Sequence, residues 1–287
     1  MKKLFYVTLA LAGITCQSSL AQKPVFQEHI SKNIPVPKGS FLGVYNMNGT
    51  VEVQGYGGSE VKFEIDQKIT GDNQNGLAEG KEEFELKFDQ SDDKLYVYLE
   101  SPWSTAPREI RPDKGQWRNQ EKEPYQVDLH FIIKVPNSLT LHVSTVNHGQ
   151  IKIEDFEGLI EAYNVNGSIE IDDAHEVAKA KSVNGAVTVN FSKSPSIASE
   201  IKTVNGKITL TYPPDLNGEF SLKTLNGDYY TNFDYTSAST GVSKVIDGGG
   251  SMKKYKISQS TRIKIGEGGQ QHATETLNGS IYIKKNI

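Results

Sequence analysis

Apolar and polar residues alternate in short segments along most of this chain, and several segments follow the dipeptide Asn-Gly. Counting from the asparagine, the residues three and five positions on are apolar, and those two and four positions on are mostly polar. Alternation with a period of two predicts a β-strand with one buried face. The predicted inward pairs are Val51 and Val53, Ile169 and Ile171, Val187 and Val189, Ile208 and Leu210, Ile281 and Ile283, and, more weakly, Tyr229 and Thr231.

The Asn-Gly dipeptides mark copies of one repeat. NVNGSIEI, SVNGAVTV and TVNGKITL are representative copies, and STVNHGQIKI is a variant with one extra residue, in which His148-Gly149 aligns with the Asn-Gly pairs. The markers at 148, 166, 184, 205 and 226 are 18, 18, 21 and 21 residues apart, so each copy predicts one structural unit. The predicted corner residues are Asn48, Gly49, His148, Gly149, Asn166, Gly167, Asn184, Gly185, Asn205, Gly206, Asn226, Gly227, Asn278 and Gly279.

This repeat predicts an all-β fold and, more specifically, a parallel β-solenoid with inserted loops. Identical units would place asparagine over asparagine, and each unit would bury the face that its neighbour leaves open. Asparagine side chains can then hydrogen-bond along the stack, while glycine permits left-handed turns. An apolar residue three positions before the Val or Leu of the marker, as in Ala162 and Ile201, predicts a further bend. Because Asn-Gly also favours hairpins, an antiparallel β-sandwich or meander is the structural alternative.

The segments outside the repeat also show β patterns. Residues 81–100 predict two alternating strands around residues 90–93, and the pattern continues over 126–135 and 138–143. These strands are predicted to be further turns of the stack or a sheet extension that caps it. An insertion near 234–251 is rich in Ser, Thr and Gly and predicts a flexible loop.

A second insertion, at 101–124, is polar and contains both tryptophans of the chain. Exposed tryptophan beside arginine can stack on a sugar or hold an anion. The candidate ligand contacts are therefore Trp103, Arg108, Arg111 and Trp117. The alternative is that the two tryptophans hold the loop against the flank of the stack.

The N-terminus has the charge and hydropathy pattern of a secretory signal peptide. Two lysines precede an apolar run over residues 4–14, and small residues lead to a cleavage position near Ala21. The expected location is the periplasm, the cell surface or the medium, and a lipoprotein acylated at Cys16 is the alternative. No later segment is long and apolar enough to form a membrane-spanning helix. The predicted organisation is a signal peptide at 1–21, a lead-in at 22–40 and a repeat domain at 41–287.

Charge and motifs argue against several function classes. The net charge is −4, and the predicted leader removes lysines but no acids, which argues against nucleic-acid binding. The six histidines are not in HExxH or paired-ligand spacing, so no metal is predicted. No cofactor motif appears either, because the glycine-rich stretch at 248–250 is not followed by a helix pattern.

Enzymes built on β-solenoids need carboxylates that converge on neighbouring turns of the stack. The outward column four positions after the marker is Glu52, Lys152, Glu170, Thr188, Thr209, Tyr230 and Tyr282, and the column two after it is Thr50, Gln150, Ser168, Ala186, Lys207, Asp228 and Ser280. Neither column places two acids on neighbouring units, so no catalytic residue is predicted. Asp172, Asp173 and His175 are the remaining cluster, and a surface turn explains them more simply.

Three segments, VNGSIEI, NGTVEVQGYGGSEVKFEI and IKIGEGGQQHATETLNGSIYIKK, resemble the DUF4097 family of exported bacterial β-strand-repeat proteins. The resemblance runs from about Phe41 to the C-terminus and is interrupted by the 101–124 insertion. It implies a β-solenoid outside the cytoplasm. It also suggests adhesion, since the family is provisionally described as adhesins, but it transfers no catalytic residues.

The leading hypothesis is therefore a non-enzymatic envelope or surface protein whose partner is a glycan, a protein or another envelope component. One alternative is a carbohydrate-active enzyme that uses loop residues over a β-solenoid. Another is an envelope factor that senses a ligand or responds to stress.

Overall fold

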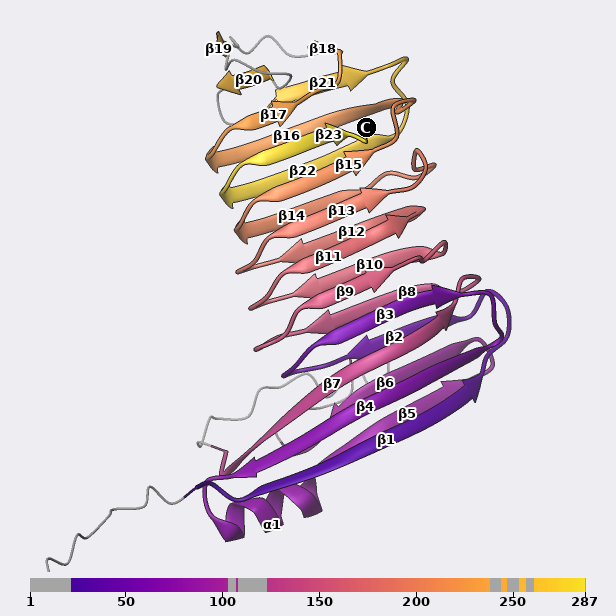
Figure 1. Ribbon diagram of the computed structural model, residues 1–287, viewed down its shortest axis with the longest axis vertical. Helices are drawn as coiled ribbons and strands as arrows, with labels where there is room; N and C mark the ends of the chain where they lie inside the picture. The colour runs from indigo at the N-terminus through magenta and orange to yellow at the C-terminus, as the bar shows by residue number, and fades with distance from the viewer. Residues whose placement is uncertain are drawn as a thin grey trace, which may run out of the picture.

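The computed structural model describes residues 22–102, 107, 123–237, 244–246, 253–256 and 261–286. These residues form an all-β structure of two large mixed sheets, stacked strand upon strand, with one helix at the lower end (Figure 1). Sheet A has 12 strands in the order β1 (Val25–Pro35), β4 (Glu60–Gly71), β7 (Tyr125–Pro136), β3 (Val51–Tyr56), β9 (Ile151–Glu154), β11 (Ile169–Ala174), β13 (Val187–Phe191), β15 (Ile208–Tyr212), β23 (Ile281–Lys285), β17 (Tyr229–Thr231), β20 (Lys253–Lys256) and β19 (Lys244–Ile246). Sheet B has 11 strands in the order β18 (Tyr235–Ser237), β21 (Thr261–Ile265), β16 (Gly218–Asn226), β22 (Gln271–Asn278), β14 (Glu200–Asn205), β12 (Glu176–Ser182), β10 (Leu159–Asn164), β8 (Thr140–Thr145), β2 (Phe41–Tyr45), β6 (Lys94–Glu100) and β5 (Glu85–Ser91).

The sequence repeat corresponds to a repeat unit, in which a strand of sheet B leads through the Asn-Gly corner into a strand of sheet A. Neighbouring units pair in parallel in both sheets. In sheet A, Val187 lies between Ile169 and Ile208, and in sheet B, Ala162 lies beside Ala180. Antiparallel pairs among the described strands are β1·β4, β4·β7 and β5·β6 at one end and β16·β21, β18·β21, β17·β20 and β19·β20 at the other. The repeat strands themselves therefore pair in parallel.

The order of the units along the stack differs from their order in the sequence. The outward columns were predicted with the unit of Tyr230 next to that of Thr209, but β22 and β23 lie between them. Thr209 therefore pairs with Tyr282, and Tyr282 pairs with Tyr230. Likewise, β2 lies between β6 and β8 in sheet B, and β3 lies between β7 and β9 in sheet A. The first and last repeat units of the chain thus have hydrogen-bonded neighbours on both sides.

The inward residues of the repeat form a continuous core between the sheets. All the predicted inward residues are buried, with exposed fractions of at most 5%. The predicted second bend is wrong. Strand β10 continues from Ala162 to Asn164, both buried, and Val165 is exposed. The two apolar residues, Ala162 and Val165, are therefore three positions apart because one points inward and the other outward in the same regular alternation.

Antiparallel strands and a helix close the N-terminal end of the stack. Strand β1 pairs with β4 along its whole length, so the predicted lead-in is part of the fold. The strand pair predicted at 81–100 is confirmed from residue 85 on as β5 and β6, in which Leu86 lies opposite Leu99, but residues 81–83 belong to a helix. Helix α1 (Gln74–Glu83), which no sequence pattern predicted, packs on β4 and β7. Its N-cap is Asn73, whose side chain accepts a hydrogen bond from the Gly76 N–H at 3.0 Å.

Candidate functional site

The corner asparagines form a continuous ladder of side-chain hydrogen bonds. Each Nδ2 except that of Asn48 donates to Oδ1 of the asparagine in the neighbouring unit, at 2.7 to 3.2 Å, and the Nδ2 of Asn48 donates to the backbone carbonyl of Val127 at 2.9 Å. The ladder contains, in order, Asn48, Asn147, Asn166, Asn184, Asn205, Asn278 and Asn226. The variant copy contributes Asn147, so the predicted alignment of His148 with the asparagines is wrong. His148 is instead the extra residue of that corner, with a φ of 54°.

The corner glycines allow neighbouring units to approach closely. A Cβ on Gly185 would lie 2.1 Å from the carbonyl oxygen of Gly167, and a similar overlap with the next glycine occurs at Gly149, Gly167, Gly206, Gly227 and Gly279. Of the predicted corner glycines, Gly49 alone has a positive φ, of 108°. The prediction of left-handed turns is therefore corrected. Glycine is required at the other corners because a backbone carbonyl occupies the space of a side chain.

A second set of hydrogen bonds, which sequence reasoning missed, fixes the same carbonyls. Two positions before each ladder asparagine lies a buried Asn, Ser or Thr. Its side chain donates to a backbone carbonyl of the neighbouring unit, as Ser182 does to Gly167 at 2.9 Å and Thr203 does to Gly185 at 2.8 Å. The signal was visible as a recurring Asn, Ser or Thr, then an aliphatic residue, then Asn-Gly. These bonds explain the corners without a ligand.

The outer face of sheet A is where a carboxylate constellation would lie. Lys152 lies between Glu52 and Glu170, so acids alternate with a base in this column, as the predicted register requires. Two positions further along the strands, Glu154 lies opposite Asp172. The Glu154 carboxylate pairs with the ammonium of Lys152 at 2.8 Å, so this acid pair is already neutralised in part.

In the predicted cluster, Asp172 and Asp173 lie near the end of β11, and His175 lies in the bend between β11 and β12. The Asp172 carboxylate accepts a hydrogen bond from Asn190, and Asp173 has a left-handed φ of 55°. The backbone N–H of His175 donates to the carbonyl of Phe156 at 3.4 Å. These contacts serve the end of the strand and the packing against the units on both sides.

Further along the same face, uncharged side chains replace the charged ones. Thr209 lies between Thr188 and Tyr282 in register, and Asn190 pairs with Thr211. These five partly exposed residues are called the neutral patch. At its edge, the ring of Tyr282 stacks on that of Tyr230, with centroids 4.7 Å apart and an interplanar angle of 8°. The patch itself presents uncharged hydroxyl and amide groups, but Lys284 adjoins it opposite Thr211, with its Nζ 5.6 Å from the centre of the Tyr282 ring.

The outer face of sheet B carries a network of ion pairs. Glu200 contacts Lys181 and pairs with Lys202 at 2.7 Å, and Glu275 pairs with Lys223 at 2.6 Å. Hydrogen bonds from Lys181 and Lys202 lower the pKa of Glu200 to about 2. The Glu200 carboxylate is therefore held ionised, and both Glu200 and Glu275 are matched by lysines.

Five ring side chains cluster on the same sheet, over β6, β2, β8 and β10: Phe41, Tyr45, Tyr96, His142 and Tyr163. The His142 ring stacks between those of Tyr45 and Tyr163, with centroids 5.0 and 5.1 Å away. The rings thus use their faces on one another and fill the space above Gly43, where a Cβ would lie 2.7 Å from the Tyr45 ring. Packing explains this cluster.

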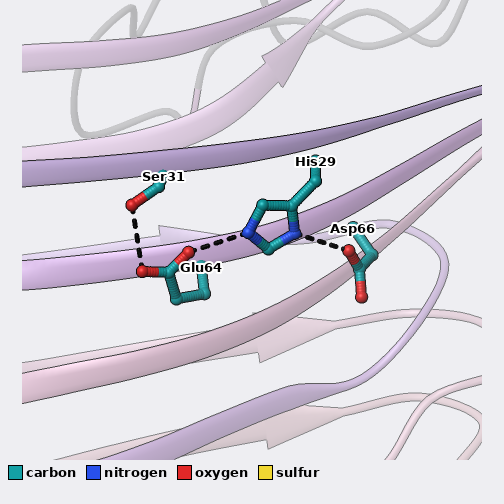
Figure 2. Close-up of polar contacts among 4 residues, drawn as sticks. All are labelled: His29, Ser31, Glu64 and Asp66. Carbon is teal, nitrogen blue, oxygen red and sulfur yellow. Dashed lines mark hydrogen bonds and ion pairs between the residues drawn. The ribbon is translucent and has the colours of Figure 1, made fainter.

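Figure 2 shows a polar cluster on β1 and β4 that resembles a Ser-His-acid triad in composition. The His29 Nδ1 lies 2.8 Å from Asp66, its Nε2 lies 2.9 Å from Glu64, and the Ser31 hydroxyl donates to Glu64 at 2.9 Å. A triad needs the serine hydroxyl against the histidine. Here both ring nitrogens face carboxylates, and these hydrogen bonds, first that to Asp66, raise the pKa of His29. The cluster favours a protonated imidazole on an exposed surface.

One histidine lies in the core. His272 is fully buried, its Nδ1 lies 2.7 Å from the Ser199 hydroxyl, and its ring stacks on Phe220. Burial lowers the pKa of His272 to about 4, so the imidazole is neutral at pH 7. Within the described part of the chain its Nε2 has no hydrogen-bond partner. Because this group is sealed from solvent, it is a structural feature of the core.

The predicted loop contacts Trp103, Arg108, Arg111 and Trp117 lie outside the described residues, as does the predicted signal peptide. In the described ranges, no three His, Cys, Asp or Glu residues are grouped so that they could hold a metal ion. No described helix is long and apolar enough to cross a membrane.

Comparisons with known proteins give distant structural neighbours. No family model and no curated protein matches this chain. A solved protein of Clostridium sporogenes, provisionally described as a cell adhesion protein, is 12% identical with a TM-score of 0.39, over 91% of this chain and 100% of its own. A provisionally described adhesin of Bacteroides fragilis is 12% identical with a TM-score of 0.30, over 90% and 97% of the two chains. A provisionally described lipid binding protein of Parabacteroides distasonis is 9% identical with a TM-score of 0.24, over 90% and 97%.

Proposed function

We propose that this protein is a non-enzymatic binding scaffold of the bacterial cell envelope, exported and built as a β-solenoid of the DUF4097 type. The parallel pairing of the repeat units and the ladders at their corners support the solenoid. The charge and hydropathy pattern of the first 21 residues supports export. The repeat motifs and the sequence of the C-terminus support the family.

The proposal that this protein is not an enzyme rests on the way lysines pair with the carboxylates on the outer faces of the two sheets. Glycoside cleavage uses a pair of convergent carboxyl groups, one of which has a raised pKa and acts as the acid. Hydrogen bonds from lysines instead lower the pKa values of Glu200 and Glu275. On sheet A, Lys152 separates Glu52 from Glu170. These acids are arranged for ion pairing.

The neutral patch is the proposed contact surface, and a neutral glycan is the ligand class that fits it. Thr188, Thr209 and Thr211 supply hydroxyl groups and Asn190 supplies an amide, on strands held at fixed spacing by the ladders. A neutral glycan offers many hydroxyl groups to such an array. Tyr282, which pairs with Thr209 in register, adds an aromatic ring that stacks on Tyr230.

Binding to an array of neutral and acidic glycans and to isolated envelope polysaccharide tests this proposal. Thr209→Lys would place a long charged side chain in the neutral patch and should weaken neutral-glycan binding at least tenfold. Lys179→Thr on the face of sheet B is the matched control and should bind like the wild type. Failure of the wild type to bind any neutral glycan, or release of new reducing ends or unsaturated products from acidic polysaccharide, would contradict the proposal.

A further inference from the structure

Lysines on the strands of the repeat units are paired with acids everywhere except on β23. Those on the other strands each form an ion pair with a glutamate, and they are Lys152, Lys179, Lys181, Lys202 and Lys223. In the described part of the chain, the two lysines of β23, Lys284 and Lys285, pair with no carboxylate. Positive charge without a counter-ion therefore lies on the strand that carries Tyr282 of the neutral patch.

Lys284 adjoins the neutral patch directly. It lies opposite Thr211 in register, and it is partly buried beside the ring of Tyr282. The ring attracts the ammonium group weakly but accepts none of the three hydrogen bonds that this group can donate. No described residue accepts them either. Lys284 is therefore free to bind an anionic group of a ligand.

A second lysine borders the patch at the start of β15. Lys207 directly precedes this strand, and the alternation of the strand places it on the same outward face as Thr209 and Thr211. Lys207 is exposed, and among the described residues it pairs with no carboxylate. It is four residues along the strand and one strand across from Lys284, which is a separation of roughly 14 Å. An extended sugar chain on the patch would lie near both lysines.

The acids on the other side of the patch, on β11, already have hydrogen-bond donors. Glu170, which pairs with Thr188 in register, accepts a hydrogen bond from the Gln150 side chain at 2.8 Å. Asp172 accepts one from Asn190 of the patch. The charges that lack a partner at this surface are therefore positive and lie on the β15 and β23 side.

We infer that the glycan bound at the neutral patch is a mostly neutral chain with isolated anionic groups, which Lys284 and Lys207 bind. This inference rests on the proposed function and names the chemistry of its ligand. Carboxylate, sulfate and phosphate groups share what the lysines require, which is negative charge and oxygen acceptors. A densely charged polyanion fits less well, because it would also bring negative charge against Glu170 and Asp172.

Matched pairs of oligosaccharides test the inference, each neutral chain being used once unmodified and once with a single carboxylate, sulfate or phosphate group. Protein expressed from the full chain should bind the charged member about tenfold more tightly, the scale of one charged hydrogen bond. This preference should fall to about twofold when the salt is raised from about 0.05 to 0.5 M, because salt screens exposed charges. Comparison of the three groups by titration calorimetry shows which of them is bound.

Lysine variants test which side chains make the contact. In Lys284→Gln the ratio of the two affinities should fall to about twofold or less, and in Lys207→Gln it should fall by a smaller factor. Lys284→Arg keeps the charge and should keep most of the preference. Lys38→Gln is the matched control, because it removes an exposed lysine that pairs with no described carboxylate from the connection between β1 and β2. Its preference should equal that of the wild type.

The outcomes separate this inference from the proposed function. Equal affinity for the two members of each pair, or an unchanged preference in Lys284→Gln, would overturn the inference and leave the neutral patch as the contact surface. Tighter binding of a densely sulfated chain than of any singly charged one would also overturn it, because the surface would then respond to overall charge. Failure to bind every chain, charged or neutral, would contradict the proposed function itself.

Discussion

The repeat units and the antiparallel strands at the N-terminal end pack around the same hydrophobic core, but different contacts hold their strands together. In the repeat, short strands are held by contacts between equivalent residues: asparagine to asparagine, and a hydroxyl or amide to a glycine carbonyl. At the N-terminal end, β1 and β4 are 11 and 12 residues long, and their outward side chains are charged or polar pairs such as His29 and Asp66. A substitution in the repeat therefore disturbs two neighbouring units, whereas one on the antiparallel face should act locally.

Glycine to alanine substitutions should show this difference most strongly. Gly185→Ala places a Cβ 2.1 Å from the Gly167 carbonyl oxygen, and two units must separate to relieve it. We expect a loss of about 4 kcal/mol in the free energy of unfolding, the scale of severe core disruptions. Gly57, in the turn before β4, has no atom within 4 Å of such a Cβ. Gly57→Ala should change the stability by less than about 1 kcal/mol.

Urea denaturation followed by circular dichroism would measure both variants. Equal losses for Gly185→Ala and Gly57→Ala would show that the close approach of the corner carbonyls is not what the repeat depends on.

The two histidines of these regions should give pH dependences of opposite sign. The pKa of buried His272 in the repeat is lowered to about 4, so the unfolded chain binds its proton first as the pH falls from about 6.5. Its contribution to stability is complete above pH 6.5 and is lost towards pH 4, by on the order of 3 kcal/mol. His29 on β1 has a raised pKa, so its smaller contribution is present below about pH 6.5 and disappears as the pH rises through the folded value.

Unfolding free energies between pH 4 and 8 for the wild type, His272→Leu and His29→Gln would separate these effects. His272→Leu should flatten the acid side of the profile, and His29→Gln should leave that side unchanged. An unchanged acid slope in His272→Leu would mean that this histidine is not the buried group that titrates.

Removal of one ladder asparagine should have the smallest effect of the three. Asn184→Ala removes two side-chain hydrogen bonds, to Asn166 and from Asn205, but leaves their partners exposed to water. A cost of about 1 kcal/mol is expected, since the freed groups can be solvated. Asn33→Ala on the exposed face of β1 is the matched control and should be nearly neutral. Similar values for both variants, measured by urea denaturation, would argue that the ladder is incidental to stability.

The strands of the repeat could be predicted because their alternation is regular and their spacing constant. The inward residues, such as Val187 and Ile208, and the parallel pairing of their units follow from that regularity. The roles of the corner residues were harder to predict from the sequence. The close approach at Gly185 depends on the distance between two backbones, and the choice of Asn147 over His148 depends on which residue of a five-residue corner bulges.

The order of the units could not be read from the chain. Each unit presents the same edges and the same inward residues, so local pattern does not decide whether Thr209 receives Tyr282 or Tyr230 as its neighbour. Helix α1 was missed because its 10 residues include two glycines, Gly76 and Gly80, that face Pro124 and Tyr125 in close contact. Its signal lies in tertiary packing rather than in hydrophobic periodicity.

The most direct test of this fold is a disulfide between neighbouring units of sheet A. In a Cys16→Ser background, Thr209→Cys with Tyr282→Cys should form an intramolecular disulfide, because paired strands hold their Cα atoms about 5 Å apart, within the range for such a bond. Thr209→Cys with Tyr230→Cys should remain reduced, since one strand lies between them. A disulfide in the second pair and none in the first, read by mass spectrometry of non-reduced peptides, would contradict the parallel stack in which the last repeat unit is inserted.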